Sequence, residues 1–523
     1  MSNRYLMAVD AGTGSVRAVI FDLDSNQIAV EQREWTHLPD PRYPGSQNFD
    51  VERNFGLVKE VIHGAIRKAG IDGRDILAVS SDSMREGIVL YDAEGRELWS
   101  CANVDARAGR EAAELMALRP GIEEDIYHES GQAFALGALA RILWVKKHEP
   151  ELYGRTRAVT MLNDWITYRL SGTLSVEPSN GCTTGIFDLK RRAWDADIAG
   201  TCGLRTDIFP AVHESGAVLG RVKPAIAAET GLSPDCLVVA GGGDAQLGCV
   251  GVGAVRPGQM ALFGGSFWQL EYNSPVPQTD KDCRLRVNCH VVPDLWQFEL
   301  LAFYPGLVMR WFRDTFCDLE KLTEERTGVS AYSLLDREAA DVPAGSNGLM
   351  CTFSDVMNYL SWKHAAPSFI NFDITQEFSK KVFYHALLEN AALVTLGHLK
   401  IVSSITGKAP QKLIFASGAS KSPLWSQIVA DVLGCAIVVP KIKEATALGT
   451  AICAGVGAGV YPDIAGAGER FMREEKTYLP DEENHKAYLS LYEKWRMVYS
   501  TQLSNANAGL TRFMWNAPGT GRT

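Results

Sequence analysis

The chain has 523 residues and a mass of 57.2 kDa, which is too long for one ordinary hydrophobic core and predicts two or three domains. Apolar residues make up 46% of the sequence and charged residues 22%, proportions typical of a soluble globular protein. The formal net charge of −10 and the shortness of the basic clusters argue against a protein that binds nucleic acid or a membrane surface.

The sequence begins with MSNRYLMAVD, which has no charged leader followed by an apolar segment, and no apolar run approaches ~18 residues. We therefore expect a cytoplasmic protein. The eleven cysteines form no CxxC pair, and no histidine lies at zinc-finger spacing from the two closest, Cys283 and Cys289. We expect reduced, mostly buried thiols and no metal site built from protein ligands alone.

The first predicted element is a β-hairpin. Residues 6–9 and 16–21 are strand-like runs on either side of the turn Asp10-Ala-Gly-Thr-Gly-Ser15. A Walker loop would lead from a strand into a helix and end in Gly-Lys-Ser/Thr, and the Rossmann fingerprint also needs a following helix, so neither applies. The backbone N–H groups and small hydroxyls of this turn could hold phosphate. A plain hairpin turn explains the two glycines equally well.

Helices and a second hairpin follow. We expect helices over 52–70, 108–118, 137–149 and 162–170, a strand over 76–82 and a hairpin over 87–99. Arg85 and Glu86 lie in the turn between that strand and the second hairpin. A guanidinium beside a carboxylate could clamp neighbouring oxygens of a small polar ligand. The alternative is an exposed charged turn.

A second glycine-dense region, 237–273, repeats this design halfway along the chain. An apolar strand enters Gly241-Gly-Gly-Asp244, a helix-like run follows, and another hairpin turns at Gly264-Gly265. We place the boundary between two similarly built domains near residue 255. The predicted domains span 1–254 and 255–503, and the tail 504–523 is expected to be loosely ordered. The second domain should contain helices over 305–316, 378–402, 423–433 and 482–503 and a strand over 413–416.

Two α/β halves, each opened by a glycine hairpin facing a cleft, resemble the actin-like, ribonuclease H-like ATPases, whose catalytic cleft lies between two domains. Six motifs narrow the resemblance to the FGGY carbohydrate kinases: residues 10–17, 170–188, 242–244, 264–266, 416–434 and 444–459. They occur in the family's order between about residues 4 and 500. The resemblance implies a kinase that uses ATP and Mg²⁺ to phosphorylate a primary hydroxyl of a short, oxygen-rich acceptor.

The resemblance also assigns contacts to individual residues. The acceptor is expected to contact Arg85, Glu86, Asp105, Phe134, Asp244 and Gln246. ATP is expected to contact Gly12, Thr13, Gly14, Ser15, Arg17, Gly265, Ser266, Gly306, Arg310, Gly418 and Ser422. Asp10 and Asp244 are expected to hold Mg²⁺, with water completing its shell. Glycerol kinases have Thr in place of Gly265 and Gln in place of Arg310, so hydroxyl contacts to phosphate would be lost there.

Asp244 is the predicted catalytic residue. Its carboxylate could accept the hydroxyl proton of the acceptor as that oxygen attacks the γ-phosphate. The alternative is an N-cap for the following helix, a position that Asp also favours. Phe134 could form an apolar wall of the acceptor site or simply belong to the core.

The resemblance leaves the acceptor open between related molecules. The closest resemblance of the chain as a whole implies linear 4,5-dihydroxypentane-2,3-dione as the acceptor, phosphorylated at its 5-hydroxyl, and a ketopentose or polyol is the alternative. A nucleotide-gated actin-like protein that senses or assembles, without any acceptor, is the alternative of another class. Because phosphocarrier proteins of sugar transport control some glycerol kinases, the resemblance also allows such a regulatory partner.

Overall fold

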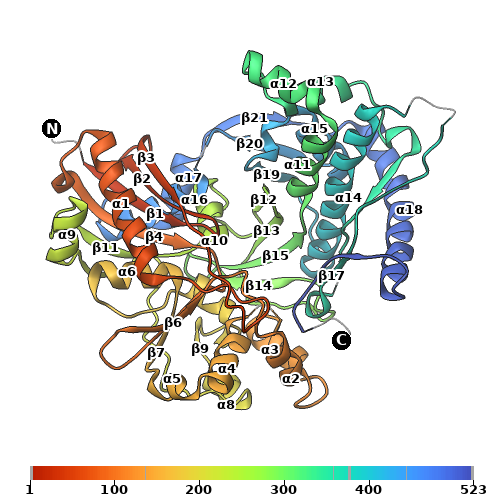
Figure 1. Ribbon diagram of the computed structural model, residues 1–523. Coiled ribbons are helices and arrows are strands. Elements are labelled where there is room, and N and C mark those ends of the chain that lie inside the picture. The colour runs from red at the N-terminus through yellow and green to blue at the C-terminus, as the bar shows by residue number, and fades with distance from the viewer. Residues whose placement is uncertain (1–3, 136, 357, 375–377, 443, 520–523) are drawn as a thin grey trace.

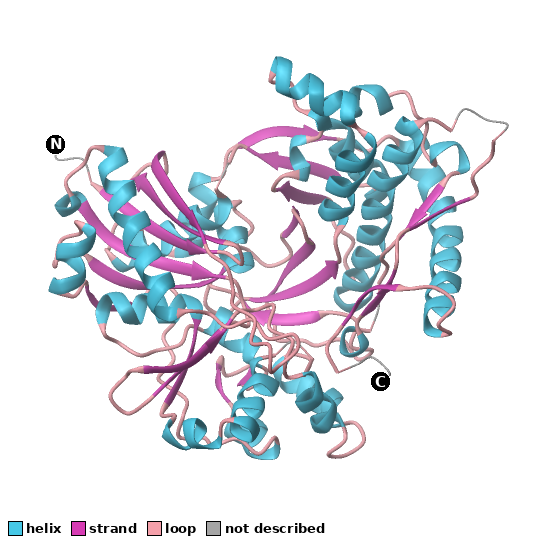
Figure 2. Cartoon of the chain, in the orientation of Figure 1, coloured by secondary structure: helices cyan, strands magenta, loops and turns pink. Residues whose placement is uncertain are grey.

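The computed structural model describes residues 4–135, 137–356, 358–374, 378–442 and 444–519. Two α/β bodies, each built on its own large sheet, lie side by side, and a smaller lobe of helices and short strands lies below the first body in the orientation of Figure 1. Strands of both large sheets run toward the region where the bodies meet (Figure 2). No helix of the described residues is both long and apolar enough to span a membrane.

The first sheet has six strands in the order β10-β11-β4-β1-β2-β3. Their bounds are β1 Tyr5–Ala11, β2 Ser15–Asp22, β3 Gln27–Glu34, β4 Ile76–Ser83, β10 Val218–Arg221 and β11 Leu237–Gly243. Strands β1 to β3 form an antiparallel meander, whereas β4 runs parallel to both β1 and β11. Because parallel strands end at the same edge of a sheet, this register places Asp10 beside Asp82 and Asp82 beside Gly242.

Both faces of the first sheet are covered, which explains why β1 is buried along its whole length. Met7 and Val9 pack with α1 (Val51–Ala69) and α6 (Leu162–Ser171), whereas Leu6 and Ala8 pack with α16 (Ala445–Gly457) on the other face. Helix α10 (Asp244–Gly251) packs against α16. The chain thus returns to the first body after building most of the second, and the boundary expected near residue 255 does not separate every segment.

The second sheet has seven strands in the order β14-β15-β13-β12-β19-β20-β21. Their bounds are β12 Met260–Gly264, β13 Trp268–Ser274, β14 Arg286–Cys289, β15 Trp296–Ala302, β19 Lys412–Ala416, β20 Ala436–Pro440 and β21 Glu474–Tyr478. The helices of this half are α11 Pro305–Phe316, α12 Asp318–Thr327, α13 Ala331–Ala339, α14 Lys380–Thr406, α15 Pro423–Leu433, α17 Ile464–Phe471 and α18 Glu482–Asn507. Helices α14 and α15 pack against each other, and their apolar side chains join those of β12, β13 and β15 in one core.

The remaining elements are short. Strands β5 Ile88–Tyr91, β6 Glu97–Cys101 and β7 Ala158–Met161 form a three-stranded sheet, and β8 Phe187–Asp188 pairs with β9 Ala193–Trp194. The helices of the first half are completed by α2 Gly109–Met116, α3 Ile122–Ser130, α4 Ala138–His148, α5 Pro150–Arg155, α7 Pro178–Gly181, α8 Ala196–Thr201 and α9 Pro224–Thr230. Strand β16 Met350–Thr352 pairs with β18 Ser368–Ile370, and β17 Lys363–Ala365 pairs with β22 Phe513–Asn516.

The sequence-based expectation for the tail differs from the structure. Residues 504–523 were expected to be loosely ordered, but α18 continues to Asn507 and residues 513–516 form β22. The Gly, Asn and Thr content of the tail hides the apolar triplet Phe513-Met-Trp515, whose side chains are partly buried and pack against the hydrophobic clusters. The eleven cysteines are all buried and free, as expected.

The packing of α10 on α16 depends on glycine and gives a stability prediction. A Cβ at Gly449 would lie 2.0 Å from the backbone oxygen of Leu247, whereas one at Gly56, also inside a helix, would meet no atom within 4 Å. Gly449→Ala should therefore lower the apparent Tm, through an overpacking cost of ~1–3 kcal/mol. Gly56→Ala, the matched control, should raise it slightly because alanine favours helix. Thermal unfolding of both variants checks this; equal melting temperatures would refute the tight packing.

Candidate active site

A cavity of about 390 Å³ lies on the second body. The β12–β13 turn, α11, α13, α14 and the segment after β19 line it. It brings together the six residues of this half that the family resemblance assigned to ATP: Gly265, Ser266, Gly306, Arg310, Gly418 and Ser422. Tyr332, Asp336, Tyr384 and Lys421 also line it, and the sequence reasoning missed them. We call it the first cavity.

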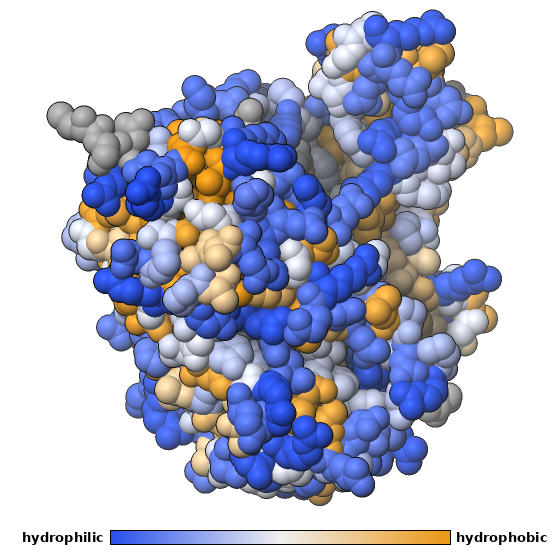
Figure 3. All heavy atoms as spheres, turned by 60° about the vertical axis from the view of Figure 1, so that its left-hand side comes forward, coloured by the Kyte–Doolittle hydropathy of each residue, from blue (hydrophilic) through white to orange (hydrophobic). Residues whose placement is uncertain are grey.

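A second cavity, of about 430 Å³, lies between the bodies. The first half of the chain contributes Thr13, Arg85, Glu86, Asn103, Val104, Asp105, Ala106 and Asp244 to its lining. The second half contributes Phe267, Gln269, Arg286, Leu301, Phe303, Tyr304, Trp362, Trp515 and Pro518. In the space-filling view the surface is hollowed beside the uppermost lobe, which carries α12 and α13, and most side chains of this face are hydrophilic (Figure 3).

The two cavities share a boundary. In the β12–β13 turn, Ser266 lines the first cavity and the next residue, Phe267, lines the second. At the start of α11, Gly306 lines the first cavity and Tyr304 lines the second. A Cβ at Gly306 would lie 2.0 Å from the backbone oxygen of Gly265, so glycine is what allows these segments to pack together.

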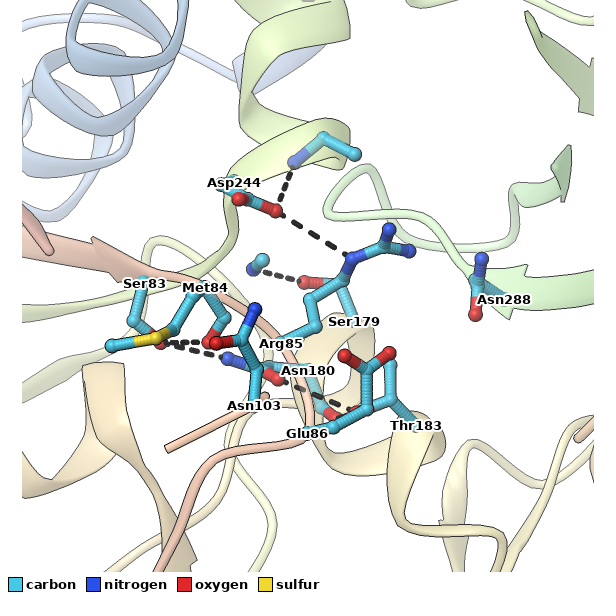
Figure 4. A network of polar contacts seen from close by, with 12 residues as sticks. Ser83, Met84, Arg85, Glu86, Asn103, Ser179, Asn180, Thr183, Asp244 and Asn288 are labelled. Atoms are coloured by element: carbon cyan, nitrogen blue, oxygen red, sulfur yellow. Dashed lines mark hydrogen bonds and ion pairs between the residues drawn. The ribbon is translucent and has the colours of Figure 1, made fainter. Parts of the chain in front are cut away.

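Asp244 lies at the first position of α10, directly after β11. Gly243 is the N-cap, so the carboxylate is not the cap that the alternative interpretation allowed; its Oδ1 accepts a hydrogen bond from the backbone N–H of Ala245 at 2.8 Å. The side chain is 42% exposed because it faces the second cavity, and Oδ1 lies 3.5 Å from Nε of Arg85 (Figure 4). Burial among surrounding protein atoms raises the pKa of Asp244 to about 6, although Arg85 opposes this shift.

Arg85 joins the two bodies through a buried ion pair. Both terminal nitrogens of its guanidinium contact the carboxylate of Glu299 on β15, and Nη2 lies 3.1 Å from Oε1. Figure 4 shows the guanidinium extending between Asp244 and Asn288. Arg85, which the resemblance assigned to the acceptor, thus borders the second cavity. Both terminal nitrogens of its guanidinium already bind the carboxylate of Glu299.

A second arginine completes this cluster. Arg286 Nη1 lies 2.6 Å from Oε1 of Glu86 and 3.6 Å from Oε1 of Glu299. Burial favours the neutral form of Glu299, but the two guanidinium groups outweigh it and hold the pKa of Glu299 below its ordinary value. Glu271, its neighbour across β13 and β15, lacks a hydrogen-bond partner for either oxygen among the described residues, and burial followed by the charge of Glu299 raises the pKa of Glu271 well above its usual range.

The turn of the first hairpin lies at the same edge. Thr13 lines the second cavity and its hydroxyl contacts the side chain of Asn103 at 3.1 Å. A Cβ at Gly14 would meet no atom within 4 Å, so the turn has open space beside it. Arg17 donates from Nε to Asp10 at 2.8 Å, and its Nη1 lies 2.7 Å from Glu444, which precedes α16. Gly12 and Ser15 flank these contacts in the chain but are absent from the lining of both cavities.

Three residues predicted to bind the acceptor have buried side chains, although Asp105 also borders the second cavity. The carboxylate of Asp105 is fully buried and accepts hydrogen bonds from Arg107 and from the backbone N–H of Gln47, both at 2.6 Å. Phe134 is 2% exposed and belongs to the core, in the same cluster as apolar residues of α3 and α4. Gln246 is fully buried on α10, and neither amide atom has a hydrogen-bond partner among the described residues.

The sequence reasoning also missed the charged residues that organise the site. Glu299 and Glu271 lie in apolar strands, where a lone carboxylate needs a compensating group nearby, and this was the available signal. Asp82 is the last residue but one of β4 and lies between two serines, and its Oδ2 accepts a hydrogen bond from Thr450 of α16 at 2.5 Å. A carboxylate at a buried strand end was again the signal. Nothing local in the sequence indicates which arginine each carboxylate meets.

Comparison with known proteins agrees with this geometry. Models of the FGGY family of carbohydrate kinases match the chain twice, the N-terminal domain over residues 5–251 and the C-terminal domain over 270–458. The autoinducer-2 kinases of Salmonella typhimurium (strain LT2) and Escherichia coli (strain K12) are each 49% identical over 520 residues, 99% of this chain and 98% of theirs.

Among solved structures, xylulose kinase from Rhodospirillum rubrum is 27% identical with a TM-score of 0.83, covering 96% of this chain and 99% of that one. Gluconate kinase from Lactobacillus acidophilus, 20% identical with a TM-score of 0.85 over 97% of this chain and 100% of that one, shares the fold. The predicted fold class, two actin-like α/β domains, is confirmed.

The buried cluster around Glu299 gives a second prediction. Glu299→Gln leaves Arg85 and Arg286 with less negative charge than they need in a dry interior, so stability should fall by ~3–5 kcal/mol. Glu493→Gln is the matched control, because Glu493 forms an exposed pair with Lys400 and its loss should change little. Melting temperatures of both variants decide the matter. A Glu299→Gln protein as stable as the control would show that the cluster contributes no net stability.

Proposed function

This chain belongs to the FGGY family of carbohydrate kinases, and we propose that it phosphorylates autoinducer-2, a quorum-sensing signal, at the 5-hydroxyl of its linear form, 4,5-dihydroxypentane-2,3-dione. ATP is the phosphoryl donor, as in the family. The near-complete length of the match to autoinducer-2 kinases supports the choice of acceptor.

The observation that carries the proposal is the shared boundary of the two cavities. A phosphoryl group passes between two oxygens that must come within bonding reach, so donor and acceptor sites have to adjoin. The first cavity contains the predicted ATP contacts, the second contains Asp244, and the β12–β13 turn borders both. We therefore assign ATP to the first cavity, with its γ-phosphate toward Ser266, and the acceptor to the second.

Asp244 is proposed as the general base. With a pKa of about 6 it is mostly ionised at neutral pH, and it faces the cavity assigned to the acceptor. Its carboxylate can accept the proton of the primary hydroxyl while that oxygen attacks the γ-phosphate. Arg85, 3.5 Å away, favours the ionised carboxylate. It therefore lowers the pKa of Asp244 and helps to keep the base ionised at neutral pH.

Backbone and arginine groups are proposed to position the phosphates. Thr13 of the first hairpin turn lines the second cavity and Gly306 of α11 lines the first, so backbone N–H groups of these two segments could bind phosphate. Arg17 supplies positive charge beside the first hairpin, although Asp10 and Glu444 already engage it. Gly265, Gly306 and Arg310 line the cavity assigned to the nucleotide.

Mg²⁺ fits the carboxylates at the ends of β1, β4 and β11. Burial and then the negative charge of Asp10 raise the pKa of Asp82 well above its usual range, and Asp82 Oδ1 has no hydrogen-bond partner among the described residues. Among the residues that the structure describes, no group of three or more Asp, Glu, His or Cys side chains is arranged to hold a metal ion. Because Mg²⁺ keeps several waters, Asp10 and Asp244 would hold it through water, and when bound it would offset the phosphate charge.

Two alternatives are separated by the same geometry. A ketopentose kinase is the second candidate, because xylulose kinase from Rhodospirillum rubrum is 27% identical over most of both chains. An actin-like protein that only senses nucleotide or assembles has no use for a polar cavity next to Asp244, so the second cavity favours a kinase. A cytoplasmic location and control by a phosphocarrier protein stay predictions from the sequence.

Replacing the proposed base gives the third prediction. Asp244→Asn keeps the shape of the side chain but removes its basicity, so kcat should fall by ~10²–10⁴. The Kd for ATP should stay within a few-fold, because the first cavity is unchanged. Asp314→Asn, an exposed aspartate of α11, is the control and should leave kcat unchanged. Steady-state rates and nucleotide titration measure both effects.

The pH profile provides a second readout on the same variants. The raised pKa means that Asp244 gains its proton as the pH falls through about 6, so kcat/KM of the unmodified enzyme should decline tenfold per unit below that value. Asp244→Asn should lack this acid limb, and the Asp314→Asn control should keep it. A base elsewhere would be indicated if Asp244→Asn kept most of its kcat with an unchanged profile.

An acceptor panel gives the fourth prediction. ATP consumption with dihydroxypentanedione, xylulose, ribulose and glycerol should be stimulated most by the dione. A higher kcat/KM for xylulose or ribulose would select the ketopentose alternative. ATP hydrolysis that no acceptor stimulates would instead support a nucleotide-gated protein.

A further inference from the structure

The C-terminal segment 512–519 crosses from the second body to the smaller lobe. Strand β22 pairs with β17, and its ends are held by hydrogen bonds from Ala366 N–H to the Arg512 oxygen at 3.0 Å and from Ala517 N–H to the Trp362 oxygen at 2.9 Å. Beyond β22 the chain continues to the start of α2.

The contact with α2 is close. A Cβ at Gly519 would lie 2.4 Å from the backbone oxygen of Gly109, and the φ of Gly519 is +82°, so two glycines allow the backbones to touch. Pro518 packs at the same point, because a Cβ at Gly109 would lie 3.4 Å from the Pro518 Cβ. The segment therefore contacts both halves of the chain at the second cavity.

Trp515 is the aromatic residue that this segment contributes to the cavity. Its ring stacks on Phe303, with centroids 4.3 Å apart and planes 20° apart. Phe303 also packs against Trp362, at 5.3 Å, and Phe267, at 5.6 Å. Trp515, Phe303, Trp362 and Phe267 all line the second cavity, so one continuous aromatic wall faces it.

The lining of the second cavity thus has two chemical characters. One group is ionic and contains Asp244, Arg85, Glu86 and Arg286. The other is the aromatic wall that ends in Trp515. An acceptor that matches both needs oxygens at the reacting end and an apolar group at the other end.

Dihydroxypentanedione has this character, because its C1 is a methyl group beside a carbonyl, whereas a ketopentose carries a hydroxymethyl group there. We propose that the C-terminal segment forms the wall for the C1 end of the acceptor, and that Trp515 makes the site selective for methyl ketones over hydroxymethyl ketones. This inference rests on the proposed function for the placement of the acceptor. A hydroxyl against the wall loses its water without gaining a partner, which disfavours binding by ~10–100-fold.

The test compares two acceptors that differ only in this hydroxyl, 1-deoxyxylulose and xylulose. Calorimetry gives a Kd for each without needing turnover, on the full-length protein and on Trp515→Ala, Trp515→Gln and Phe513→Ala. Phe513 is the matched control, because it lies on the same strand but packs in a cluster with Tyr499 and is absent from the cavity lining. Melting temperatures establish that each variant is folded.

The unmodified protein should bind 1-deoxyxylulose at least tenfold more tightly than xylulose. Trp515→Ala should reduce this preference below threefold, and Trp515→Gln, which offers the hydroxyl a partner, should abolish or reverse it. Phe513→Ala should keep the preference, and the Kd for ATP should stay within twofold throughout.

The proposal is overturned if the unmodified protein shows no preference between the pair, or if every folded Trp515 variant keeps it. Failure of the proposed function would look different. In that case dihydroxypentanedione would not stimulate ATP consumption, while the preference between the two xyluloses and its dependence on Trp515 would still be measured.

Discussion

The buried ion pair of Arg85 and Glu299 is the constraint on which the site depends. Arg85 belongs to the loop after β4 of the first sheet, and Glu299 belongs to β15 of the second, so the pair fixes one body relative to the other at the catalytic centre. Both charges have left water, and each is tolerated only because the other is there. Asp244 and Arg286 extend the chain of opposite charges, so the ionisation of the proposed base is tied to the contact between the bodies.

A second ionic contact also links the two halves of the chain, on the other side of β1. Arg17 connects Asp10 of the first hairpin with Glu444, which precedes α16. Asp82 lies between these groups and Asp244, and burial followed by the negative charge of Asp10 raises its pKa. The strand edge therefore carries acidic groups whose charge a cation or a proton can offset, a suitable surrounding for phosphates that arrive with Mg²⁺.

Local patterns were sufficient to predict the elements that border the site, whereas many of the short strands and helices were not predicted. The hairpins β1–β2 and β12–β13, the strand leading to Asp244 and the helix α15 follow from alternation, turn glycines and apolar periodicity, which act within a few residues. The residues predicted to contact ATP around Gly265 and Gly418 also line one cavity, because motifs at strand ends meet at a sheet edge. Partners in the ion pairs could not be predicted in this way: Arg85 and Glu299 are 214 positions apart, and only the register of two sheets brings them together. Phe134 belongs to the core, one of the two outcomes that the sequence left open, since an aromatic residue suits a core and a binding wall equally well.

The position of α16 has a consequence for the order in which the protein can be completed during synthesis. Residues 445–457 cover the face of the first sheet formed by Leu6, Ala8 and their neighbours, although more than 180 residues of the second body precede them in the chain. A ribosome that has released the first 254 residues has therefore produced a sheet with one apolar face still open to water. Such a face is prone to aggregation or to capture by chaperones until α16 emerges. The two bodies therefore cannot complete their folding independently of each other. The chain gains its final stability only when nearly all of it has left the ribosome.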